Sequence, residues 1–174
     1  MHRFFAIALL ILIGLNPIPA KAATDCLAKY IPTATSVGMG AGTRFIFHAY
    51  DAELFAPQGT YVKDRPFALE LTYRMQFSGS AIARESIKQM QRMRTIDQKT
   101  IADWHQKMAT IFPDVTPGMS ITGLRLENGK VVFCTLEREI GQMTDKDFAD
   151  AFFGIWLDEK AESPALRRQL TGQP

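Results

Sequence analysis

The sequence TRFIFHAYDAELFAP, residues 43–57, predicts one long β-strand. Successive side chains of a strand point to opposite faces of a sheet, and both alternating sets contain apolar residues here. The segment is therefore expected to be an interior strand that is buried on both faces. Ile46, His48 and Tyr50 share one of these faces, so an imidazole and a phenol lie on an otherwise apolar surface. We expect this face to form the floor of a pocket.

The composition is that of an ordinary globular protein, with 174 residues, of which 47% are hydrophobic and 22% charged. Residues 1–22 are a separate unit, because His2 and Arg3 precede an apolar run that ends before the small-residue sequence Ala20-Lys21-Ala22. This layout predicts a secretory signal peptide cleaved after Ala22. The apolar run is shorter than the about 20 residues that a membrane-spanning helix needs, so no stable membrane anchor is expected after processing. A single domain, residues 23–174, is predicted to be periplasmic or secreted.

The charge balance of the exported domain excludes one class of partner. Cleavage removes Arg3 and Lys21 and no acidic residue, so the 20 basic residues fall to 18 and equal the 18 acidic ones. The basic residues between Arg84 and Arg94 lie at helical spacing among acidic and amide side chains, which is typical of a solvated helix face. Without a basic stripe, the sequence predicts no nucleic-acid partner.

The cysteines are Cys26 and Cys134, and both remain after cleavage. In an oxidising compartment the expected outcome is a disulfide between them. The bond would tie the N-terminal segment to a strand near the C-terminal end and close a loop of about 100 residues. Two unpaired buried thiols are the alternative that the sequence leaves open.

The periodicity along the chain predicts a sheet with separate helices. The glycine-rich segment 36–43 is expected to be a turn or bulge, and Asn128-Gly129 between two apolar runs predicts an antiparallel hairpin. The other predicted elements are a strand at 67–77, a helix from Ser78 or Ser80 to about Met93, a helix at 97–112, a helix opened by Thr144-x-x-Asp147, and a short helix delimited by Ser163, Pro164 and Gly172. Strands and helices do not alternate regularly, so the predicted class is α+β, an antiparallel sheet with helices packed on one face.

The exported domain shows no motif for metal, cofactor or nucleophilic chemistry. Its histidines are His48 and His105, without an HExxH motif or a Cys/His cluster, and no serine has a G-x-S-x-G context. The candidate functional groups are instead His48, Tyr50 and Tyr73, polar side chains on apolar strand faces. Each could be a core residue whose polar atom is bonded to the backbone. Alternatively, they line a pocket for an apolar ligand with one polar end.

The order of several short motifs resembles the bacterial secreted branch of the chalcone isomerase-like superfamily. The motifs are AYDAELFAP (49–57), FSG (77–79), Pro113-x-x-x-Pro117-Gly118, Asn128-Gly129, AFFGIWLD (151–158) and SPAL (163–166). The resemblance covers nearly the whole exported domain. It implies an open-faced β-sandwich, in which a large antiparallel sheet carries a layer of helices and a cleft lies between them.

The resemblance also carries expectations about function. The family includes plant isomerases that close a chalcone into a flavanone, and non-catalytic relatives that bind fatty acids. The isomerase Arg, Thr, Tyr and Asn fall near Gly38, on Tyr50, near Ile82 and near Gln89, so none is kept. The resemblance therefore implies a non-catalytic protein that binds a small apolar or fatty-acid-like molecule in the cleft.

The expected ligand site combines polar groups from the strands with an apolar wall. Its residues are His48, Tyr50 and Tyr73, with Ile46, Ile82 and Met90 as the wall. Two alternatives to the binding function stay open: an intramolecular lyase or isomerase of the chalcone isomerase type with a rebuilt site, and a structural or interaction module whose cleft is filled.

Overall fold

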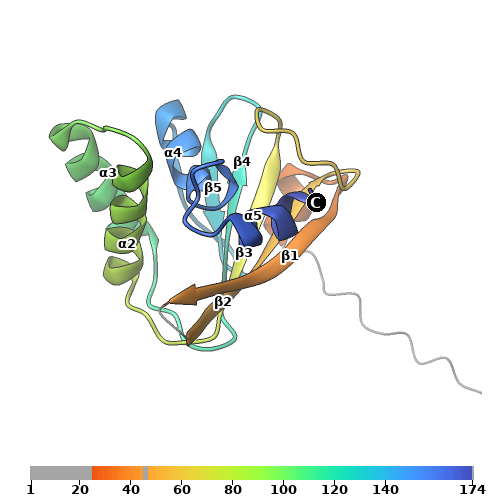
Figure 1. Ribbon diagram of the computed structural model, residues 1–174, viewed down its shortest axis with the longest axis horizontal. Coiled ribbons are helices and arrows are strands. Elements are labelled where there is room, and N and C mark those ends of the chain that lie inside the picture. Colours follow the sequence, from red (N-terminus) through yellow and green to blue (C-terminus); the bar gives the residue numbers. More distant parts are fainter. Residues whose placement is uncertain (1–24, 45–46, 174) are drawn as a thin grey trace, which may run out of the picture.

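The computed structural model describes residues 25–44 and 47–173, which form one antiparallel sheet and its surrounding helices (Figure 1). The elements in chain order are α1 (Asp25–Tyr30), β1 (Ala34–Arg44), β2 (Phe47–Pro57), β3 (Phe67–Tyr73), α2 (Gly79–Met93), α3 (Gln98–Ile111), β4 (Ser120–Arg125), β5 (Val131–Cys134), β6 (Glu139–Met143), α4 (Lys146–Leu157) and α5 (Pro164–Thr171). The six strands pair in sequence order from β1 to β6, and every pairing is antiparallel. The predicted α+β class and open sheet are confirmed.

The two faces of the sheet bury different cores. One face contributes Phe67, Leu69 and Phe133 to the main core, which also takes in the apolar sides of α2, α3, α4 and α5. The opposite face contributes Ala68, Val132 and other residues to a smaller core under α1. The helices are therefore not confined to one face, because α1 covers part of the other.

The predicted disulfide holds α1 in place. Cys26 on α1 and Cys134 on β5 are joined, with their Cα atoms 6.5 Å apart, and both belong to the smaller core. Tyr30 Oη also donates to Glu139 Oε2 on β6 at 2.7 Å. A helix of six residues is too short to be stable alone, so these tertiary contacts fix it.

The long strand predicted at 43–57 is wrong in its boundaries. β1 ends at Arg44 and β2 begins at Phe47, which is its partner in the β1–β2 ladder, so the segment is divided between two strands. The glycine-rich segment is not a turn but most of β1, and it contains a β-bulge at Val37, between the pairs Ser36–Phe55 and Gly38–Leu54. β2 is nevertheless interior, because it pairs with β1 on one side and β3 on the other.

The glycines of β1 recur at every second position because that face is in close contact with other parts of the protein. A Cβ on Gly38 would lie 2.0 Å from the backbone oxygen of Gln169 in α5, and one on Gly42 would lie 2.1 Å from the ring of Tyr50. Because these glycines have no side chains, α5 and Tyr50 can pack directly on the strand. Side chains of a strand return to the same face at every second residue, and the glycines at 38, 40 and 42 follow this repeat. The glycine-rich pattern that suggested a turn therefore belongs to one face of a strand.

The predicted helix ends and hairpin agree closely with the structure. Ser78 caps α2, Ser163 caps α5 with Pro164 in its first turn, and Gly172 ends α5 with a φ of 66°. The Asn128-Gly129 turn joins β4 and β5. The cap of α4 differs from the prediction: Asp145, not Thr144, accepts from the backbone N–H of Asp147. Asp145 also accepts from Trp104 Nε1 at 2.9 Å, which links α3 to the start of α4.

Candidate functional site

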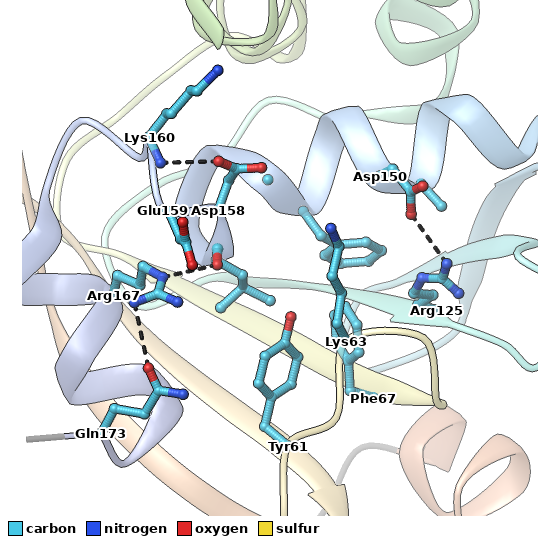
Figure 2. Close-up of a pocket in the computed structure, with 14 residues that line it drawn as sticks. Tyr61, Lys63, Phe67, Arg125, Asp150, Asp158, Glu159, Lys160, Arg167 and Gln173 are labelled. Atoms are coloured by element: carbon cyan, nitrogen blue, oxygen red, sulfur yellow. Dashed lines mark hydrogen bonds and ion pairs between the residues drawn. The ribbon is translucent and has the colours of Figure 1, made fainter. Parts of the chain in front are cut away.

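A pocket of about 510 Å³ lies on the main-core face of the sheet, beside the C-terminal half of α4 (Figure 2). Its walls come from the 58–66 segment between β2 and β3, from the ends of β3 and β4, and from α4, α5 and the segment that joins these helices. The lining residues are Tyr61, Lys63, Phe67, Arg125, Ala149, Asp150, Phe153, Gly154, Leu157, Asp158, Glu159, Lys160, Arg167 and Gln173. Segments distant in sequence thus meet at one opening.

The floor of the pocket is aromatic and apolar. Phe67 on β3 and Phe153 on α4 meet edge to face, with ring centroids 4.8 Å apart, and Tyr61 meets Phe67 in the same way at 5.3 Å. Leu157 continues this surface at the end of α4. Edge-to-face contacts fix aromatic rings in place, so the floor is preformed.

Arg125 is the most deeply buried charged residue that lines the pocket, with 3% of its surface exposed. Strand alternation places it on the main-core face, opposite Phe67 in the β3–β4 ladder. Its Nη2 donates to Asp150 Oδ1 on α4 at 3.1 Å and lies 3.6 Å from Asp64 Oδ1. A buried guanidinium is tolerated when such carboxylates neutralise it.

Arg167 on α5 provides a second guanidinium on the opposite wall. Its Nε donates to the backbone oxygen of Leu157 at 3.0 Å and its Nη1 to Gln173 Oε1 at 3.4 Å (Figure 2). Within the described chain it has no carboxylate partner within 4 Å. Asp158 and Glu159 add negative charge to the same rim, and Lys160 adds positive charge. The rim is therefore of mixed sign, with Arg167 as its most firmly positioned cation.

Tyr61 and Lys63 reach over the pocket from the 58–66 segment (Figure 2). Burial raises the pKa of the Tyr61 phenol to about 12, although Arg167 and Arg125 act in the opposite direction. The phenol is therefore neutral at physiological pH and can donate a hydrogen bond. Neither its hydroxyl nor the Lys63 ammonium is bonded to another described residue, so both are available to a ligand.

The structure separates His48 from Tyr50, although the two side chains were expected to act together. Thr43 pairs with His48 but Gly42 pairs with Tyr50, so Ala49 is an extra residue and forms a β-bulge in β2. The bulge turns His48 away from the face of Tyr50. The imidazole is 48% exposed, and its Nε2 bonds Asp51 Oδ1 at 2.7 Å. Arg74 also binds the carboxylate of Asp51, which lowers the pKa of that group.

Tyr50 and Tyr73 do meet, but as packed groups. Their ring centroids are 6.4 Å apart, and Tyr73 is 4% exposed. The Tyr50 hydroxyl accepts from Trp156 Nε1 on α4 at 2.8 Å. Burial raises the pKa of both phenols. The Tyr50 phenol is therefore packed against β3 and α4 and bonded to another side chain of the protein.

The apolar wall predicted for that site is only partly described. Met90 is fully buried in the main core and Ile82 is partly buried against it. Ile46 lies outside the described residues. The ligand-binding role predicted for this set stays a prediction.

Arg125, Tyr61 and Arg167 were not predicted as site residues. The sequence held a signal for Arg125, because it lies two residues after Gly123 and four after Ile121, on the apolar side of a predicted strand. Tyr61 and Arg167 gave no such signal, since one follows a turn and the other lies on a short polar helix. No group of His, Cys, Asp or Glu side chains in the described chain is placed to hold a metal ion.

The sequence pattern of the chalcone isomerase-like family matches residues 36–172. Because this range covers most of the chain, the protein belongs to the chalcone isomerase-like family. An uncharacterised protein of Haemophilus influenzae is 30% identical over 128 residues, which are 73% of this chain and 62% of that protein. The chain thus spans less than two thirds of that relative's length.

A solved structure supports the fold. The crystal structure of an Arabidopsis thaliana fatty-acid binding protein superposes with a TM-score of 0.61, over 80% of this chain and 87% of that one. The sequences are 7% identical, so this likeness concerns the fold alone.

Proposed function

We propose that this protein is an exported, non-catalytic member of its family that binds a small apolar or lipid-like molecule in the pocket beside α4. The observation that carries the proposal is the pocket itself, about 510 Å³, with an aromatic floor formed by Tyr61, Phe67 and Phe153 and a charged rim. Its volume lies within the range of about 300 to 1,000 Å³ that is typical of small-molecule sites.

The contacts of the isomerase positions support a binding function over catalysis. The isomerase positions fall on or near Gly38, Tyr50, Ile82 and Gln89, which supply no cation. Gly38 is covered by the backbone of α5, and the Tyr50 hydroxyl is bonded to Trp156. Stabilising a developing oxyanion requires preorganised donors directed at it. The name of the Arabidopsis structure, a fatty-acid binding protein, adds support for a lipid-like ligand.

The proposed location is the periplasm or the extracellular space. The signal-peptide pattern of residues 1–22 supports export, and so does the Cys26–Cys134 disulfide, because such bonds persist in oxidising compartments. In the described part of the chain, no helix has the length and apolar character needed to span a bilayer. N-terminal sequencing of the exported protein should begin at Ala23, and an intact Met1 in a membrane fraction would contradict export.

Calorimetry against a panel of acyl and phenolic compounds tests the pocket. We expect saturable binding that Lys63→Trp abolishes, because Lys63 is exposed and extends over the pocket, so the indole fills the space without disturbing the core. Lys63→Gln is the matched control, since it removes the charge without adding volume.

A second variant that fills space with a tryptophan tests where in the protein the ligand binds. Ile82→Trp adds the same bulk to the space between β2 and α2, and we expect it to leave the affinity unchanged, with circular dichroism confirming both folds. Absence of any binding would contradict the proposed function. Binding that survives Lys63→Trp but not Ile82→Trp would move the site to the space predicted from the sequence.

A further inference from the structure

Arg125 has hydrogen-bonding capacity that the protein does not use. Its five N–H donors serve one hydrogen bond, from Nη2 to Asp150. The Nε and Nη1 groups have no partner in residues 25–44 and 47–173. In the same part of the chain, no fully buried side-chain nitrogen or oxygen lacks a partner. These donors are therefore not sealed in the core, and the opening that reaches them is the pocket that Arg125 lines.

Asp64 holds a different position from Asp150 at this guanidinium. Asp150 accepts a hydrogen bond at 3.1 Å and its side chain is 35% exposed. Asp64 lies 3.6 Å from the same nitrogen, beyond hydrogen-bond length, and its side chain is 79% exposed. One carboxylate already neutralises Arg125, so the second adds an excess negative charge that is weakly held.

The chain around Asp64 faces the pocket. Tyr61 and Lys63 precede it and both line the pocket, while the next residue, Arg65, is held outside it by Glu127 at 3.2 Å. Asp64 does not line the pocket itself, but its carboxylate reaches the guanidinium of Arg125, which does. A ligand with an acid group would approach the same guanidinium from the pocket.

We propose that Asp64 is an internal competitor, whose carboxylate competes for the Arg125 guanidinium with the carboxylate of an acidic amphipathic ligand in the pocket. The acid group of the ligand displaces Asp64, while its apolar body lies on Phe67 and Phe153. Asp150 stays in place and keeps Arg125 neutralised in the free protein. This inference rests on the proposed function of the same pocket, and it adds both the head-group class and a built-in limit on affinity.

Calorimetry with dodecanoate and its neutral methyl ester tests the competition. Asp64→Asn removes the competing charge, so we expect dodecanoate to bind about two- to fivefold more tightly, the range for an exposed ion pair, with the ester unchanged. Glu159→Gln is the matched control, because it removes the same charge from the pocket rim at a residue that has no ion pair with Arg125. It should alter both affinities less than Asp64→Asn alters that of dodecanoate.

Hydrogen exchange of the 58–66 segment gives a second readout. Displacement of Asp64 should speed exchange in this segment when dodecanoate binds to the wild-type protein, and the ester should not. The competitor is contradicted if Asp64→Asn leaves dodecanoate affinity unchanged, if acid and ester respond equally, or if Glu159→Gln reproduces the effect. Binding of the ester but not the acid would also overturn it and leave the proposed function standing. If wild-type protein binds neither, both proposals fail.

Discussion

Arg125 and Asp150 illustrate how a single buried charge depends on its partner. The arginine side chain is 4% exposed and cannot move to water without disrupting β4, whereas Asp150 lies on the neighbouring helix. Removing the carboxylate leaves the buried guanidinium with only Asp64, which is 79% exposed and lies 3.6 Å away without a hydrogen bond. The loss of one partner is costlier than the net value of the pair, because the remaining charge is uncompensated.

Asp150→Ala should therefore lower the free energy of unfolding by about 2 kcal/mol, the range for a hydrogen bond to a charged group. Urea denaturation measures the change. Asp103→Ala is the matched control, since Asp103 is also helical and paired, but with Lys107 on an exposed surface. That pair should contribute no more than about 0.5 kcal/mol. Equal losses in the two variants would show that Arg125 does not depend on Asp150.

The roles of single residues were predictable from sequence where they do not depend on how neighbouring strands are aligned. The cysteine pair, the Ser163 cap and Gly172 are of this kind. His48 was misplaced because the bulge at Ala49 reverses the alternation, and a bulge is a property of the hydrogen-bond ladder that composition does not report. The site residue Arg125 could have been found, since a charge on the apolar side of a strand is unusual.

At the scale of elements, β1 is shaped by what packs on it. Gly38 and Gly40 face α5, and a side chain at either position would overlap Gln169 or Leu166. The opposite set of side chains in β1 is more exposed, and includes Met39 and Ala41. The helix that carries Arg167 is therefore positioned by the absence of side chains on the neighbouring strand.

Gly38→Ala should displace α5, because the new Cβ would lie 2.0 Å from a backbone oxygen that cannot rotate away. We expect a loss of about 1 to 3 kcal/mol in the free energy of unfolding, as for other overpacked sites, and faster hydrogen exchange in α5. Ala41→Val, an exposed substitution on the same strand, should change stability by less than about 0.5 kcal/mol. Unchanged exchange in α5 of the Gly38 variant would contradict the direct contact.

The long periodic elements α2, α3, α4 and β3 were predicted from sequence, as were the β4–β5 hairpin and the short helix α5, whereas α1, β1 and β6 were not. The apolar repeats of α2, α3 and α4 and the alternation of β3 identify elements that bury one face. α1 and β6 have six and five residues, and their order comes from contacts with the rest of the protein. β1 was missed because glycines at alternate positions are equally compatible with a turn when the packing partner is unknown.

On the scale of the whole molecule, the sheet separates the pocket beside α4 from the disulfide. The pocket lies on the main-core face with Phe67 and Arg125, whereas Cys26, Cys134 and α1 belong to the smaller core on the other face. The disulfide joins residues 108 positions apart, so it closes most of the described chain into one loop. Stability and binding should therefore respond differently to its removal.

Replacing both cysteines by serine should lower the free energy of unfolding by as much as about 4 to 5 kcal/mol, because an unlinked chain of this length gains conformational entropy when it unfolds. Urea denaturation with and without reductant measures this loss, and only the wild-type protein should respond to the reductant. Under conditions where the serine variant remains folded, its affinity for dodecanoate should match that of the wild type, since the sheet lies between the two sites. A fall in affinity larger than twofold, with the fold intact by circular dichroism, would show that α1 and the pocket are coupled through the sheet.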